Sequence, residues 1–138
     1  MTLSAEQFDV LIEILGNRPE IETAYLHGSA AKGTLRPDSD LDIAILPPPG
    51  KTFPMKARLD CAASIESVLH RTVDLGLLST NNLIYAKEVI EHGKELFSKN
   101  PFHAKRFLAT CLSMYADLQQ QRKEVINAYS ALGMKING

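Results

Sequence analysis

The most constraining feature of the sequence is the segment from Asp40 to Leu46, DLDIAIL, which is followed directly by three prolines and a glycine. Successive side chains of a β-strand point to opposite faces, so Asp40 and Asp42 would share one face while the apolar residues occupy the other. Two carboxylates about 7 Å apart on one face repel each other. A fold keeps such a pair where a cation neutralises it, and oxygen ligands suit Mg²⁺ or Mn²⁺. The segment therefore predicts a strand with a metal-binding face.

A third acid, Asp74, repeats this pattern in a second expected strand at 72–78. Its carboxylate would face away from its apolar neighbours, in a strand too hydrophobic to face solvent on both sides. If this strand lies beside the strand of Asp40 and Asp42, three carboxylates meet on one face. That is the ligand set of a two-metal site, which clamps the attacking and leaving oxygens of a phosphoryl displacement.

A possible anion site precedes the acids at Gly28 and Ser29, where a short expected strand at 23–27 leads into a helical turn. The backbone N–H groups and the positive end of such a helix attract phosphate, and the Ser29 hydroxyl can add a hydrogen bond. Lys32, Arg36 and Ser39 are further candidates for binding the nucleotide, and His27 adjoins the turn. A triphosphate held here would have its metal-bound oxygens beside the acids. The expected reaction is in-line attack on the α-phosphate, with pyrophosphate leaving.

The remaining patterns alternate between helix and strand over 138 residues, the length of one domain. Apolar spacing predicts a helix after Ser4, another at 54–70 with Leu59 and Ala63 among its core positions, and a third at 82–92. A brief edge strand is expected at 95–98. The sequence therefore predicts a mixed α/β fold, with a mixed sheet of about four strands flanked by helices.

A long final helix is expected from Pro101 onward, with Asn100 as its N-cap. It would run about 48 Å, past a domain about 30 Å across. Seven residues follow alternating steps of four and three, as in the seam of a helix pair: Cys111, Tyr115, Leu118, Arg122, Val125, Tyr129 and Leu132. One interpretation is a frayed distal tail, and the other is docking on a partner or a second copy. The preferred division is a catalytic domain at 1–99 and, at 100–138, a helix that packs on it and on a partner.

Composition narrows the classes of function. The chain has 15 lysines and arginines against 16 aspartates and glutamates, which argues against direct, stable binding of nucleic acid. Cys61 and Cys111 are far apart, as expected of buried, reduced thiols. The N-terminal stretch carries acids where a signal peptide carries bases, and no apolar run is long enough to cross a membrane. These features predict a cytoplasmic protein.

The stretch from His27 to Asp42, HGSAAKGTLRPDSDLD, resembles the G-S-x10-D-x-D signature of the DNA polymerase β-like nucleotidyltransferase superfamily. It is most similar to minimal nucleotidyltransferase (MNT) proteins, the antitoxins of HEPN/MNT toxin–antitoxin pairs, and the resemblance covers about 23–98. It implies a small nucleotidyltransferase fold in which Gly28 and Ser29 bind the nucleotide phosphates. Asp40 and Asp42 would ligate Mg²⁺. Asp74 would complete the metal site and help to deprotonate the acceptor hydroxyl.

The resemblance also implies a substrate and a partner. Antitoxins of this branch transfer AMP from ATP to a tyrosine of a HEPN ribonuclease toxin, which silences it within a hetero-oligomeric complex. Two alternatives stay open: an antitoxin that acts only by binding its toxin, and a nucleotidyltransferase with a small-molecule acceptor. Asp60 is the rival of Asp74 as the third acid, although it lies in a helical pattern.

Overall fold

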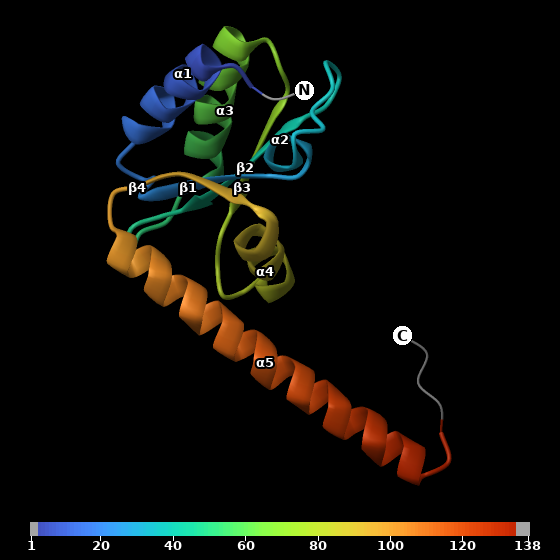
Figure 1. Ribbon diagram of the computed structural model, residues 1–138. Helices are drawn as coiled ribbons and strands as arrows, with labels where there is room; N and C mark the ends of the chain where they lie inside the picture. The colour runs from blue at the N-terminus through green and yellow to red at the C-terminus, as the bar shows by residue number, and fades with distance from the viewer. Residues whose placement is uncertain (1–2, 135–138) are drawn as a thin grey trace.

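The four expected strands form one sheet in the computed structural model, which describes residues 3–134 (Figure 1). They are β1 (Thr23–His27), β2 (Leu41–Leu46), β3 (Val73–Leu77) and β4 (Lys94–Ser98). The order is β3-β2-β1-β4, in which β1 runs antiparallel to β2 and β4, and β2 runs parallel to β3. The mixed sheet and the edge position of β4 confirm the expectations from the sequence, and β2 and β3 are adjacent, as the meeting of the acids requires.

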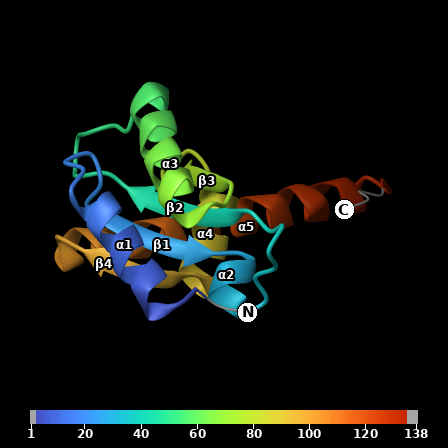
Figure 2. The same cartoon turned by 90° about the horizontal axis from the view of Figure 1, so that it is seen from above.

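Helices cover both faces of this sheet, as Figures 1 and 2 show. α1 (Ala5–Gly16) and α3 (Met55–Leu69) lie on one face, while α4 (Leu83–His92) and α5 (Pro101–Ala131) lie on the other. α2 (Ser29–Lys32) is a single turn between β1 and β2. Three of the helices begin with a capping side chain. The Ser4 hydroxyl accepts the N–H of Gln7 at the start of α1, and the Asn82 and Asn100 side chains cap α4 and α5.

The two faces of β2 belong to two apolar cores. On one face of β2, Leu41, Ile43 and Ile45 pack under α1 and α3. On the other face, Ala44 and Leu46 pack under α4 and α5. Both cysteines are buried and unpaired, as predicted. The assignment of Leu59 and Ala63 to the core was wrong, because both are exposed. At about 100° per residue, they lie off the stripe that faces the sheet. That stripe consists of Cys61, Ala62, Ile65 and Leu69.

α5 begins on the sheet and ends beyond the rest of the domain (Figure 1). Ala104 and Cys111 are buried in its first half, and the Lys87 ammonium of α4 lies 4.7 Å from the ring centre of Tyr115. Its start is fixed at the sheet, where His103 Nδ1 lies 2.5 Å from Oε1 of the buried Glu22. Of the helices described between residues 3 and 134, none is long and apolar enough to cross a membrane.

Candidate active site

A row of three ionisable side chains crosses the sheet from β1 to β3. His27 is the partner of Asp42 in the antiparallel pair β1–β2, and Asp42 is the partner of Asp74 in the parallel pair β2–β3. Asp42 alternates with the buried residues Ile43 and Ile45, which face α1 and α3. The row is therefore on the sheet face that also carries α4 and α5.

The electrostatics of the row centre on Asp42. Partial burial raises the pKa of its carboxyl group, and the negative charges of Asp74 and Asp40 raise it further, while His27 lowers it. Asp40 lies one residue before β2 and is exposed. The charges of Asp74 and Asp40 thus disfavour the ionised form of Asp42. Such a site attracts a cation.

Gly28 brings the backbone against this carboxylate. Its φ of +66° is a conformation that residues with a side chain rarely adopt, and a Cβ here would lie 2.6 Å from Asp42 Oδ2. α2, which follows, has only four residues, so it lacks the macrodipole assumed from the sequence. What the turn offers an anion is the set of N–H groups at the start of the helix, together with the Ser29 hydroxyl.

The other predicted nucleotide-binding residues lie on the segment between α2 and β2. Lys32 and Arg36 are exposed, and Ser39 closes a turn in which its Oγ accepts the Arg36 N–H at 3.0 Å. Sequence reasoning missed Arg71, whose Nη1 donates to the carbonyl oxygens of Arg36 (2.7 Å) and Ser39 (3.2 Å). Arg71, two residues before β3, therefore holds this turn in place, and no local sequence pattern reveals a contact across more than thirty residues.

Tyr85 of α4 is a second residue that sequence reasoning missed. Its Oη lies 3.2 Å from His27 Nε2, and the two rings meet edge to face with centres 5.4 Å apart. Burial, followed by the charges of Asp74 and Asp42, raises the pKa of Tyr85 to about 12. The one available signal was Gly76, since a glycine inside a strand often marks a close approach. A Cβ on Gly76 would lie 2.0 Å from Tyr85 Oη.

The donor set of the row fits a divalent cation bound together with a nucleotide. Within residues 3–134, no group of three or more histidine, cysteine, aspartate and glutamate side chains is placed to hold a metal ion by itself. Mg²⁺ usually takes only one or two carboxylates and completes its shell with water and substrate phosphates. Asp42 and Asp74 are such a pair, and the absence of a Cβ at Gly28 leaves that space beside Asp42 Oδ2 free of a side chain.

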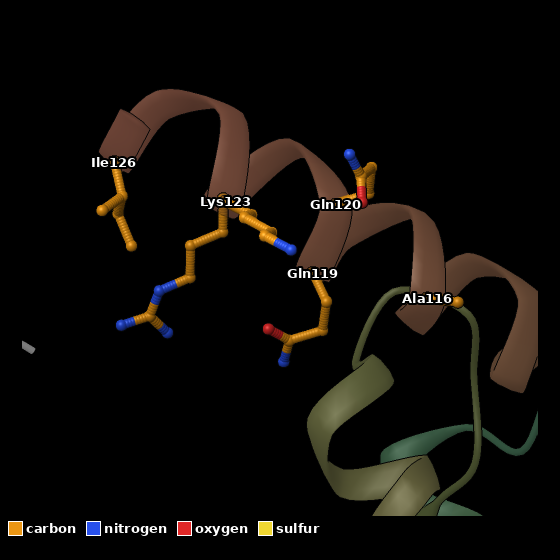
Figure 3. Close-up of a pocket in the computed structure, with 6 residues that line it drawn as sticks. Ala116, Gln119, Gln120, Lys123 and Ile126 are labelled. Carbon is orange, nitrogen blue, oxygen red and sulfur yellow. The ribbon is translucent and has the colours of Figure 1, made fainter. Parts of the chain in front are cut away.

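Two surface hollows lie elsewhere, along the distal part of α5. One, of about 440 Å³, runs between α4 and α5, and we call it the α4–α5 groove; it is lined by Ile84, Tyr115, Leu118, Gln119, Gln121, Arg122 and Val125. The other is lined by α5 alone, and Figure 3 shows its side chains Ala116, Gln119, Gln120, Lys123 and Ile126 projecting from one helix. Neither hollow includes a residue of the acidic row.

Comparison with known proteins identifies the family of this chain. Residues 9–102 match the family model described as "Polymerase beta, Nucleotidyltransferase". The chain is 32% identical to Protein adenylyltransferase MntA of Shewanella oneidensis over 111 residues, which are 80% of this chain and 78% of the relative.

Solved structures agree as well. One, a toxin–antitoxin with AMP-PNP, has a chain that is 30% identical, with a TM-score of 0.69 and coverage of 93% of this chain and 99% of that one. Another holds a tri-AMPylated Shewanella oneidensis HEPN toxin in complex with an MNT antitoxin, and matches with 28% identity and a TM-score of 0.69 over 91% and 97% of the two chains. With the family model covering more than half of its length, the chain belongs to the polymerase beta nucleotidyltransferase family.

Proposed function

We propose that this protein is an antitoxin that transfers AMP from ATP to a tyrosine of a cognate HEPN ribonuclease toxin and thereby neutralises it. The observation that carries the proposal is the direct pairing of Asp42 with Asp74, beside a glycine turn that approaches the Asp42 carboxylate. The similarity to an adenylyltransferase and to toxin complexes supports the choice of acceptor. Its compartment would be the cytoplasm, where thiols such as Cys61 and Cys111 stay reduced.

In this proposal the nucleotide lies across the ends of β1 and β2. The N–H groups and hydroxyl at Gly28 and Ser29 bind the phosphates. Lys32, Arg36 and Ser39 provide further contacts to the nucleotide. Asp42 and Asp74, with Asp40 directly before β2, would hold Mg²⁺, or Mn²⁺ in its place, together with the nucleotide phosphates. When bound, the cation supplies positive charge to phosphate oxygens.

The acceptor approaches from the side of β3. Its hydroxyl oxygen forms a bond to the α-phosphorus, and the bond from that phosphorus to the pyrophosphate oxygen breaks. Asp74 takes the proton of the hydroxyl, so the products are the AMP-modified tyrosine, pyrophosphate and a proton. Asp74 suits this role because it is exposed in an otherwise buried part of β3.

We assign the catalytic domain to residues 1–99. Residues 100–138 would pack on this domain and also contact the partner. Beyond the contacts with α4, Leu118, Val125 and Tyr129 of α5 are exposed, as is Leu132 directly after the helix. Ile84 of α4, which lines the groove, is 72% exposed. We propose that the toxin docks with an apolar surface in the α4–α5 groove. The solved complexes that match nearly the whole chain support a toxin as the occupant.

The test is the intact mass of the co-purified toxin after incubation with this protein, ATP and Mg²⁺. The wild type should add the mass of one AMP or a multiple, and a variant with Asp40→Asn and Asp42→Asn should add none. The exposed Asp60→Asn variant, which changes an acid of α3, is the matched control and should transfer AMP normally. Toxicity that is suppressed without any gain in mass would instead establish an antitoxin that acts by binding alone.

A further inference from the structure

His27 lies between the glycine turn at Gly28 and the carboxylate of Asp42. It is the last residue of β1, directly before Gly28, and it faces Asp42 across the β1–β2 pair. Residues directly opposite each other in an antiparallel pair have Cβ atoms about 4.5–5.5 Å apart, so the imidazole and the carboxylate are immediate neighbours. The position of the His27 ring therefore limits where the Asp42 carboxylate can lie.

Tyr85 fixes the ring of His27. An imidazole can rotate about its bond to Cβ, and a hydrogen bond at one ring nitrogen selects both the orientation and the tautomer. Tyr85 Oη provides that bond at Nε2, with a separation of 3.2 Å and the rings at 81° to each other. Since Gly76 leaves room for the hydroxyl on the same strand as Asp74, the contact is built into the sheet.

We propose that Tyr85 and His27 are a positioning pair, in which the Tyr85 hydroxyl holds the His27 ring so that the Asp42 carboxylate is oriented for a divalent cation. The inference rests on the proposed metal-dependent function and assigns a role to two residues outside the G-S-x10-D-x-D motif. Hydrogen-bonded partners behind metal ligands commonly contribute about 10- to 100-fold to metal affinity or activity. Tyr85 comes from α4, so the orientation of a ligand on β2 depends on a helix far from it in the sequence.

The direct test is Mn²⁺ binding to the full chain, measured by electron paramagnetic resonance with Mn²⁺ alone and with Mn²⁺ plus AMP-PNP. Tyr85→Phe keeps the ring and removes only the hydroxyl, and its dissociation constant for Mn²⁺ should rise about tenfold. Tyr25→Phe is the matched control, because Tyr25 is another partly buried tyrosine on the same sheet face whose pKa is raised by burial and a nearby glutamate. Its Mn²⁺ affinity should equal that of the wild type.

A second variant, His27→Gln, separates positioning from folding. The glutamine amide can still meet the Tyr85 hydroxyl but lacks the rigid ring that lies beside Asp42, so Mn²⁺ affinity should fall as in Tyr85→Phe. If the two residues act as a unit, the double variant should bind no more weakly than His27→Gln alone. In AMP transfer, the variants should lower kcat at limiting Mn²⁺, while KM for ATP at saturating Mn²⁺ stays within about twofold of the wild type.

The outcomes separate this inference from the proposed function. If Asp42→Asn loses Mn²⁺ binding while Tyr85→Phe and His27→Gln bind as tightly as Tyr25→Phe, the positioning pair is refuted and the metal-dependent site stands. If Asp42→Asn binds Mn²⁺ as the wild type does, the proposed site is wrong, and the pair is refuted with it. Circular dichroism melting of each variant identifies one that fails to fold, and the remaining member of the pair then decides the outcome.

Discussion

The hydroxyl oxygen of Tyr85 occupies the position next to Gly76 that a side chain would need, since a Cβ on Gly76 would lie 2.0 Å from that oxygen and 2.7 Å from the Cζ atom behind it. The hydroxyl reaches His27 from this position. A glycine on β3 thus determines where a tyrosine of α4 can meet the end of β1.

Gly76→Ala should force Tyr85 out of this position and break its hydrogen bond to His27. Overpacking of this kind costs about 1–3 kcal/mol of folding free energy, which urea unfolding would measure. Gly16→Ala is the control, because Gly16 lies in α1 with nothing within 4 Å of an added Cβ, and it should be neutral or slightly stabilising. Adding Tyr85→Ala to Gly76→Ala should cost less than the sum of the single variants, and strict additivity would contradict the collision.

Gly28→Ala should impair binding of AMP-PNP and Mn²⁺. The added Cβ would lie 2.6 Å from Asp42 Oδ2 and would push this carboxylate out of the row. Gly50→Ala shares the positive φ, at +72°, but meets nothing within 4 Å, so it should be destabilised while binding both normally. Isothermal titration calorimetry on both variants checks the difference. Equal affinities would show that the approach of Gly28 to Asp42 is irrelevant to binding.

Asp42→Asn should stabilise the metal-free protein at neutral pH. Burial first, then Asp74 and Asp40, raise the pKa of Asp42 above its ordinary value of 3.8, so the unfolded chain releases this proton at a lower pH than the folded protein. The folded wild type therefore loses stability as the pH rises from about 3.8 through the raised pKa, and asparagine does not titrate. Thermal melting in EDTA should show a higher Tm for the variant at pH 7 and a smaller difference near pH 4.

The exposed Asp60→Asn variant controls for the loss of a negative charge. It should change the free energy of unfolding by less than about 0.5 kcal/mol at either pH. An Asp42→Asn variant that is less stable than the wild type at pH 7 without metal would contradict the raised pKa.

Val125→Glu should weaken the complex with the toxin while leaving AMP-PNP binding unchanged. Val125 lines the α4–α5 groove and is 50% exposed, so a charge there would enter the proposed apolar contact without disturbing the domain. Met55→Glu is the control, since Met55 is 59% exposed on α3, which covers the opposite face of the sheet. Calorimetric titration with the toxin compares the two. Identical affinities would favour the interpretation of the distal helix as an unbound tail.

Much of the fold could be predicted because its signals are local. Ser4 and Asn100 cap the helices that follow them, and the alternation around Asp42 assigns each side chain of β2 to a face. Leu59 shows the limit of such patterns. Apolar spacing in α3 permits more than one stripe, and packing against the sheet selects the one that contains Ile65.

The candidate site was predictable in its motif but not in its supporting contacts. Gly28 and Asp42 belong to one short stretch of sequence, whereas Tyr85 meets His27 across 58 residues and Arg71 meets the carbonyl of Arg36 across 35. Such contacts depend on the order of the strands and on the position of α4, which no short-range pattern encodes. Gly76 alone hinted at one of them.

The anchoring of α5 also determines which parts of a bound molecule can be reached. The His103 side chain and the Lys99 N–H both contact Glu22, so the start of the helix is held next to the residue that precedes β1. A toxin bound to the distal turns of α5 would lie at a fixed distance and angle from Asp74. The length of the helix would then fix the distance from Asp74 at which a tyrosine can receive AMP. That tyrosine would be selected by its position on the toxin rather than by the residues around it.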